Sequence, residues 1–196
     1  FTNIQLNVGW DVILTAVAGI GILAFGMTMV VITGEIDLSV AGVAVLSTVV
    51  GGLLIATGSP LLIIGAVLLC GLVLGIINGI LVAKVGISSL ISTLAMLGIA
   101  GALANIFSGG QAAYPEKIAE FMWFGRGTVF GVPVPIALFA LMALICLFLT
   151  RSATFGRRLY ATGGNARAAM LSGIRGDRVK IAVFAFCGVC AAVAGL

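Results

Sequence analysis

The sequence predicts an all-α polytopic membrane helix bundle, with five complete transmembrane helices and one partial helix in a truncated chain. Of its 196 residues, 62% are hydrophobic and 8% are charged, and the mean hydropathy is +1.32. A soluble domain is about a quarter charged. Several apolar runs also reach the length of about 20 residues that one bilayer crossing needs. These observations exclude soluble enzymes and disordered linkers.

The apolar runs between charged residues define the predicted helices. The longest run, 38–83, is about twice the length of one crossing. The Gly-Ser-Pro sequence at 58–60 divides it, because glycine and proline interrupt helices. We therefore expect helices at 12–33, 38–57, 61–83, 86–107, 133–150 and 181–196.

Basic residues are concentrated in one segment, which sets the expected orientation. Seven of the ten lie between 151 and 180, and Asp177 is the only acidic residue there. Loops rich in Lys and Arg face the cytoplasm, and a single basic segment between apolar runs favours such a loop over a nucleic-acid site. The predicted cytoplasmic loops are 34–37, 84–85 and 151–180, and the predicted external segments are 1–11, 58–60 and 109–131.

Small and polar residues within the apolar runs indicate how the helices associate. Gly71, Gly75 and Gly79 form one stripe, along which a neighbouring backbone can approach closely. Polar side chains in a membrane need a partner or a wet cavity, so they either bind a neighbouring helix or line a transport path. The candidate path residues are Thr33, Asp37, Ser39, Asn78, Ser92, Thr93 and Asn105.

No catalytic arrangement is present in the sequence. The chain has no histidine, and no glycine-rich loop carries the lysine of a phosphate-binding loop. The four cysteines lie in apolar runs and are expected to be free thiols. We therefore expect a protein without a catalytic site, metal site or cofactor of its own, so that any ATP would be hydrolysed by a partner.

Two interpretations of residues 33–40 stay open. In the first, the segment is a tight turn at the membrane surface, in which Gly34 supplies backbone freedom and Asp37 or Ser39 caps the next helix. In the second, it lies below the surface as a helix break whose exposed backbone lines a cavity. The sequence does not give its depth.

The basic segment contains a predicted short helix. The pattern puts a turn at residues 163–165, an N-cap at Asn165, helix from 166 to 172 and a left-handed stop at Gly173. The helix carries Ala168, Ala169 and Leu171 and little charge, which favours docking into a groove of a partner. The alternative is a helix that lies on anionic lipid headgroups.

The external segment 109–131 is rich in aromatic residues, which suit the headgroup region of a bilayer. An interfacial helix opened by Pro115 is one interpretation, and a surface for an external partner is the other.

Several motifs resemble the permease subunits of bacterial ATP-binding cassette (ABC) sugar importers of the ribose, xylose and rhamnose type. They are the stretch from Gly26 to Val40, the pair Asn78-Gly79 followed by Lys84, and the sequence from Gly156 to Ile174. The resemblance covers nearly the whole chain. Glu35 and Ala41 depart from it, because the family often has glycine or a small or polar residue at the first position and usually glycine at the second.

The resemblance implies a translocation subunit of the inner membrane that imports a neutral monosaccharide or similar polyol. It implies a cytoplasmic ABC ATPase that binds ATP and magnesium, a periplasmic sugar-binding protein, and a second permease copy, identical or related. Residues 1–196 would form one permease domain, incomplete at both ends, with 151–180 as its coupling loop. The residues expected to couple to the ATPase are Gly156, Arg157, Gly164, Asn165, Ala168, Ala169, Leu171 and Gly173.

Other classes of function are kept as alternatives. A secondary transporter or channel would need no ATPase partner, and a membrane scaffold would carry no solute. A secondary transporter predicts ionisable groups at mid-membrane. In this chain only Glu35 and Asp37 come close to that description.

Overall fold

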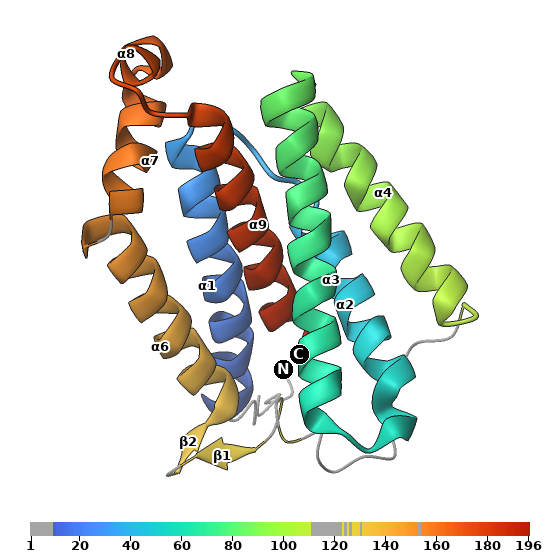
Figure 1. Ribbon diagram of the computed structural model, residues 1–196. Coiled ribbons are helices and arrows are strands. Elements are labelled where there is room, and N and C mark those ends of the chain that lie inside the picture. Colours follow the sequence, from blue (N-terminus) through green and yellow to red (C-terminus); the bar gives the residue numbers. More distant parts are fainter. Residues whose placement is uncertain (1–9, 111–122, 124, 126, 130, 153) are drawn as a thin grey trace, which may run out of the picture.

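The computed structural model describes residues 10–110, 123, 125, 127–129, 131–152 and 154–196. It confirms the predicted all-α membrane bundle (Figure 1). Among the described residues, five helical stretches are long and apolar enough to cross a membrane. The bundle helices are α1 (Trp10–Ile32), α2 (Val40–Leu54), α3 (Pro60–Ile80), α4 (Ser89–Phe107), α6 (Val134–Leu147) and α9 (Gly176–Ala194).

The predicted break at 58–60 is confirmed, and its geometry follows from its residues. A 3-10 turn, Ile55–Thr57, ends at Gly58, whose φ of 66° lies in the left-handed region that glycine favours. Ser59 is extended, and Pro60 opens α3, where its missing N–H has no helical partner to lose.

The predicted loop at 84–85 is wrong. Helix α3 continues through a π-type turn, Leu81–Val85, and the chain leaves the helix only at Gly86, where φ is 81°. Helix α4 accordingly begins at Ser89 instead of 86. Lys84 lies in the last turn of this helical stretch. It does not interrupt the helix, because its charged side chain is exposed to solvent.

Helix α9 is the central helix of the bundle. It packs against α1, α2 and α3, and its Phe184, Cys187 and Cys190 are completely buried. It begins at Gly176, earlier than the predicted 181. The charges of Asp177, Arg178 and Lys180 conceal this start in the sequence, since they occupy the first turns of the helix at the end of the bundle.

The stripe on α3 forms the close contact with α9. A methyl group added at Gly71 or Gly75 would collide with the carbonyl oxygen of Gly188 or Phe184, and one added at Gly79 would lie 2.7 Å from Ile181 Cα. Gly188 is equally restricted by the carbonyl of Gly71. The two backbones therefore touch without intervening side chains, and we call this contact the glycine seam.

The chain segments separate into two ends of the bundle (Figure 1). Segments 33–39, 86–88, 151–152 and 154–175 lie toward the end that carries the short helix α8 (Ala166–Leu171), which we call the loop end. The short antiparallel strands β1 (Thr128–Val129) and β2 (Val132–Pro133) lie at the opposite end. The segments that the sequence predicted to face the cytoplasm thus share one end, although 84–85 is helical. Most of the aromatic segment expected to hold an interfacial helix falls outside the described residues.

Candidate functional site

The loop end contains a helix that the sequence analysis missed. After a π-type turn, Phe148–Ser152, helix α7 runs over Thr154–Gly164. The predicted turn at 163–165 is wrong, because the two glycines form the last residues of α7 and the chain breaks only at Asn165. Three glycines and two arginines in α7 obscured the helix in the sequence, although Leu159 and Thr162 form a buried face.

Two glycines of α7 seat this helix on the bundle. A methyl group at Gly156 would collide with the carbonyl of Thr150, and one at Gly163 would collide with the carbonyl of Ile32, the last residue of α1. Gly156 is buried, so within this chain it makes a packing contact instead of forming an exposed surface. Gly164 is exposed and has open space around it.

Helix α8 follows with both ends capped as predicted. The Asn165 side chain accepts a hydrogen bond from the backbone N–H of Ala168 at 2.9 Å. Gly173 has φ of 79°, and the N–H of Ile174 donates to the carbonyl of Ala169 at 2.9 Å, which closes the C-terminal turn. These bonds define a short helix despite its length of six residues.

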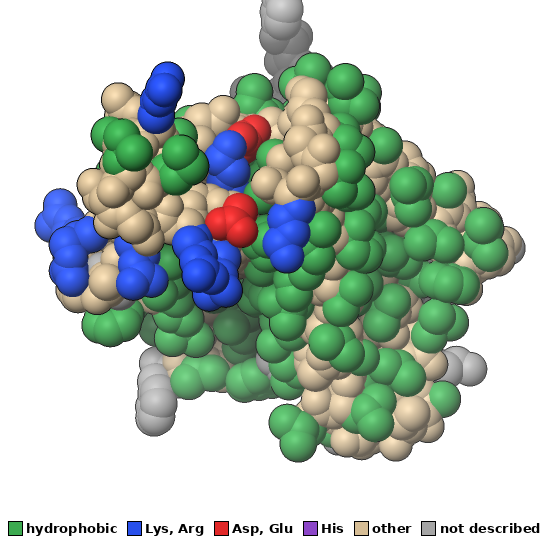
Figure 2. All heavy atoms as spheres, turned by 45° about the horizontal axis from the view of Figure 1, so that its top comes forward, with side chains coloured by type: hydrophobic (Ala, Val, Ile, Leu, Met, Phe, Trp, Pro, Cys, Tyr) green, Lys and Arg blue, Asp and Glu red, His purple; other side chains and the backbone are tan. Residues whose placement is uncertain are grey.

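The outer surface of α8 is apolar and open. Leu171 is 80% exposed and Met170 is 66% exposed, whereas Ala169 is buried against the loop end. Figure 2 shows that Lys and Arg side chains gather around this end of the molecule. Met170 was not among the expected coupling residues. The sequence feature that could have identified Met170 is its position beside Leu171 in a helix with almost no charge.

The segment between α1 and α2 is extended and bonded to α4. The backbone N–H of Ile36 donates to Ser89 Oγ at 3.3 Å, and that of Leu38 donates to Thr93 Oγ1 at 3.0 Å. Side chains from another helix therefore satisfy backbone groups that no helix or sheet satisfies here.

A hydrogen-bond network continues from this segment into α3 and α4. Asp37 Oδ1 accepts bonds from the backbone N–H and the hydroxyl of Ser39, at 2.9 and 2.5 Å. Asn78 Nδ2 donates to Ser39 Oγ at 2.9 Å, and Ser92 Oγ donates to Asn78 Oδ1 at 3.4 Å. All four residues are buried, and we call them, together with Thr93, the polar network.

The network shows how deep the segment lies in the bundle. Asn78 precedes the end of the helical stretch at Val85 by two turns, or about 10 Å at 1.5 Å per residue. Ser39 is bonded to Asn78, so the chain descends from Gly34 into the bundle before α2 begins. Asp37 and Ser39 are each only 1% exposed, which shows that neighbouring helices surround them. This burial agrees with the second interpretation, and the depth of the segment in a membrane stays a prediction.

The structure brings together five of the seven candidate path residues. Thr33 is also buried, but its hydroxyl donates to the carbonyl of Val30 in the preceding helix α1, at 2.7 Å. Asn105 is exposed near the other end of α4. A role of these residues in a transport path stays a prediction.

One ion pair joins the extended segment to α9. Lys180 Nζ contacts Glu35 Oε1, and both side chains are partly buried. The contact was not predicted, since it connects residues far apart in the sequence. Two contacts therefore lead from α7 and α9 toward the segment that precedes α2. One is the contact of Gly163 with Ile32, and the other is the ion pair of Lys180 with Glu35.

Metal ligands are not grouped in the described part of the chain. No cluster of three or more His, Cys, Asp or Glu side chains occurs there, and the four cysteines are free thiols.

Comparison with known proteins assigns this architecture to a family. The family model described as "Branched-chain amino acid transport system / permease component" matches residues 10–196, and the chain belongs to this family. The chain is thus a multi-pass membrane protein of a permease family. No solved structure gave a significant match.

Curated relatives with similar sequences include sugar import permeases. The ribose import permease protein RbsC of Bacillus subtilis (strain 168) is 39% identical over 93% of this chain and 58% of its own length. RbsC of Escherichia coli (strain K12) is 33% identical, over 89% and 56%. The L-arabinose ABC transporter permease protein AraH of Azospirillum brasilense is 39% identical, over 94% and 54%. The chain thus spans about half the length of these relatives.

Proposed function

We propose that this chain is the membrane-spanning translocation subunit of an ABC importer that moves a neutral monosaccharide or similar polyol into the cytoplasm of a bacterium. The family and the named functions of the relatives support this class. The observation that carries the proposal is helix α8, a capped helix that displays Leu171 and Met170 at the loop end of a membrane bundle.

In this proposal α8 is the coupling helix and docks into a cytoplasmic ABC ATPase, which binds ATP and magnesium. The loop end then faces the cytoplasm, as the basic residues of 151–180 favour. An exposed apolar helix face gains free energy when a groove covers it. The surrounding arginines suit an acidic rim on the partner, which would speed association and set the orientation.

The contacts beyond α8 would carry motion into the membrane. A shift of α8 moves α7, whose Gly163 rests on the end of α1, and moves the start of α9, whose Lys180 holds Glu35. Both connections end at the extended segment, which is bonded through the polar network to α3 and α4. These elements would therefore respond when the ATPase closes on ATP.

The remaining partners follow from the same class. A periplasmic sugar-binding protein would deliver the solute, and a second permease copy would form the other half of the path. A neutral solute is recognised by hydrogen bonds instead of ion pairs. The interior of this bundle suits such a solute, because its buried polar groups are mainly hydroxyls and one amide.

A secondary transporter is the second candidate, and the buried Asp37 carboxylate is the observation in its favour. Ionisable groups inside a membrane bundle are often part of an ion pathway. In this chain, however, Asp37 Oδ1 accepts two hydrogen bonds from Ser39, so the carboxylate also has a local structural partner.

A charge on α8 tests the coupling role. Leu171→Asp in the full-length protein, reconstituted with its ATPase and binding protein, should lower solute-stimulated ATP hydrolysis and uptake at least tenfold, because an unpaired charge in an apolar groove costs more than the roughly 1.4 kcal/mol that a factor of ten represents. Leu61→Asp is the matched control, because Leu61 is 82% exposed at the opposite end of the bundle.

The same assay separates the two candidates. Uptake that continues without the ATPase would support a secondary transporter. Normal coupling in the Leu171→Asp protein would contradict the assignment of α8 as the coupling helix.

A further inference from the structure

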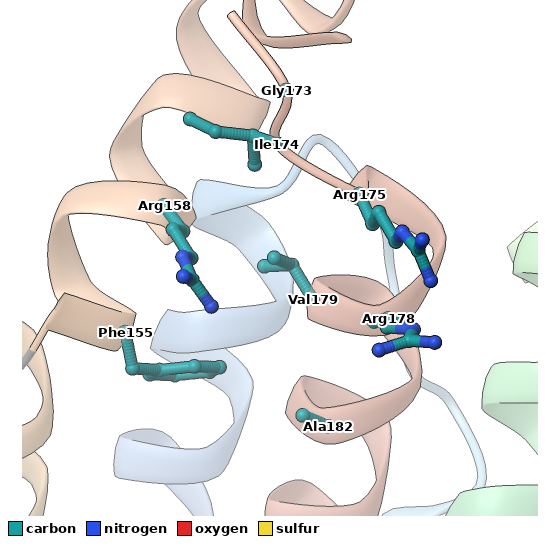
Figure 3. Close-up of a pocket in the computed structure, with 8 residues that line it drawn as sticks. All are labelled: Phe155, Arg158, Gly173, Ile174, Arg175, Arg178, Val179 and Ala182. Carbon is teal, nitrogen blue, oxygen red and sulfur yellow. The ribbon is translucent and has the colours of Figure 1, made fainter.

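A pocket between α7 and α9 combines three arginines with an apolar floor. Its volume is about 290 Å³, and Figure 3 shows its lining residues. Arg158 extends from α7 above the ring of Phe155, while Arg175 and Arg178 come from the start of α9. Val179 and Ala182 continue the wall along α9. The pocket therefore combines three guanidinium groups with apolar side chains, and Phe155 and Ala182 lie at its lower side in Figure 3.

The arginines have no partner among the residues that the structure describes. None of the three makes an ion pair or a side-chain hydrogen bond with another described residue, and the pocket lining includes no acidic side chain. An adjoining hollow, which shares Arg175 with this pocket, differs because Asp177 and Lys180 also line it. Three guanidinium groups around one pocket repel each other unless an anion lies between them.

The position of the pocket matches the headgroup level of a bilayer. The apolar span that includes α6 ends at Ser152, and Phe155 follows within the first turn of α7. Phe155 thus follows the end of this apolar span by three residues, and Arg158 lies about one helical turn farther along, as a headgroup contact would require. Arginine binds phosphate oxygens in pairs through its planar fork, which suits a phosphate at this level.

We propose that this pocket binds the phosphate of an anionic phospholipid from the leaflet next to the loop end. The headgroup phosphate lies between Arg158, Arg175 and Arg178, and the adjoining acyl chain covers Phe155, Val179 and Ala182. The apolar floor favours a lipid over a free phosphate or an acidic peptide, since neither of these would cover it. The bound lipid would brace α7 against α9 at the base of α8.

The test is lipid retention by the full-length protein in nanodiscs of phosphatidylethanolamine, with phosphatidylglycerol as the anionic lipid and phosphatidylcholine as the neutral one. Native mass spectrometry counts the lipids that stay bound. The triple variant Arg158→Gln, Arg175→Gln and Arg178→Gln should lose phosphatidylglycerol affinity about fivefold for each arginine, or about a hundredfold in all. Phosphatidylcholine retention should not change.

The control variant removes the same charge outside the pocket. It carries Arg151→Gln, Arg157→Gln and Arg167→Gln, all at exposed positions of the loop end. It should retain phosphatidylglycerol like the wild type. Equal losses in the two variants would show diffuse attraction between charges and would overturn the proposal, as would unchanged binding in the pocket variant.

Two further arms address folding and the source of the phosphate. A triple Arg→Lys variant at the pocket keeps the charge but loses the paired bonds, so it should show an intermediate affinity if the pocket is folded. Short-chain phosphatidylglycerol should displace the bound lipid, whereas inorganic phosphate at the same concentration should not. Equal displacement by inorganic phosphate would overturn the lipid assignment.

Discussion

The glycine seam and the polar network join helices of the same bundle in opposite ways. The seam brings α3 and α9 together by removing side chains, so that backbone touches backbone at Gly71 and Gly75. The network joins the 33–39 segment, α3 and α4 by hydrogen bonds that involve side chains, at 2.9 to 3.4 Å. Close backbone contact allows one arrangement only, whereas hydrogen bonds can be exchanged for others.

The difference indicates which part of the bundle can move. The seam has no alternative packing, because any shift along it opens a gap or causes a collision. The extended segment is connected to α7 and α9 through one glycine contact and one ion pair. We therefore expect α3 and α9 to move as one body and the 33–39 segment to adjust beside them.

The largest expected effect comes from filling the seam. Gly75→Leu should lower the free energy of unfolding by about 3 kcal/mol, since the new side chain meets the backbone of Phe184 and Ala185. Gly65→Leu in the same helix is the control, because nothing lies within 4 Å of that position. Reversible unfolding in mixed micelles measures both. Equal stability of the two variants would contradict a rigid seam.

A smaller effect is expected in the network. Asn78→Leu removes the bond to Ser39 and the bond from Ser92, and it should cost about 1 to 2 kcal/mol of unfolding free energy. Asn105→Ala on the exposed side of α4 should change stability by less than about 0.5 kcal/mol. The same unfolding assay applies. Equal losses of unfolding free energy in the Asn78 and Asn105 variants would contradict a stabilising role of the polar network.

The third effect is local to α8. Asn165→Ala removes the N-cap and should weaken this helix by about 1 kcal/mol. Amide hydrogen exchange should then be faster at residues 166–171 and unchanged in α9 across the seam. Ser172→Ala, at an exposed position after the helix, serves as the control. Faster exchange throughout α9 would show that the loop end and the seam are one unit.

The smallest effect on stability is expected at the ion pair. Lys180→Gln should cost about 0.5 kcal/mol, because partly exposed pairs contribute little. A double-mutant cycle with Glu35→Gln should show coupling that decreases with salt. Lys84→Gln, at an exposed position of the same end, should show no coupling to Glu35. Absence of coupling between Lys180 and Glu35 would show that the segment is held by the network alone.

Much of the fold could be predicted from local features of the sequence. The apolar runs predicted the helices, and Gly58 and Pro60 predicted the break before α3, because each acts through its own backbone conformation. Asn165 and Gly173 predicted both ends of α8 for the same reason. These signals need no information about distant residues.

The prediction failed where a neighbouring helix decides the structure. Helix α7 contains residues of low helix propensity, and its Gly163 is explained only by the carbonyl of Ile32 beneath it. Lys84 and Lys180 were interpreted as helix boundaries, although charges at the end of a bundle can reach solvent from within a helix.

The sequence by itself determined the membrane class, the apolar helices of the described bundle and the caps of α8, because composition and local backbone preference are properties of short segments. Only the tertiary structure decided the burial of the 33–39 segment, the partner of Glu35 and the grouping of Arg158 with Arg175 and Arg178. The physical reason is that buried polar groups and close contacts must be satisfied by residues that the fold, and not the sequence order, brings near.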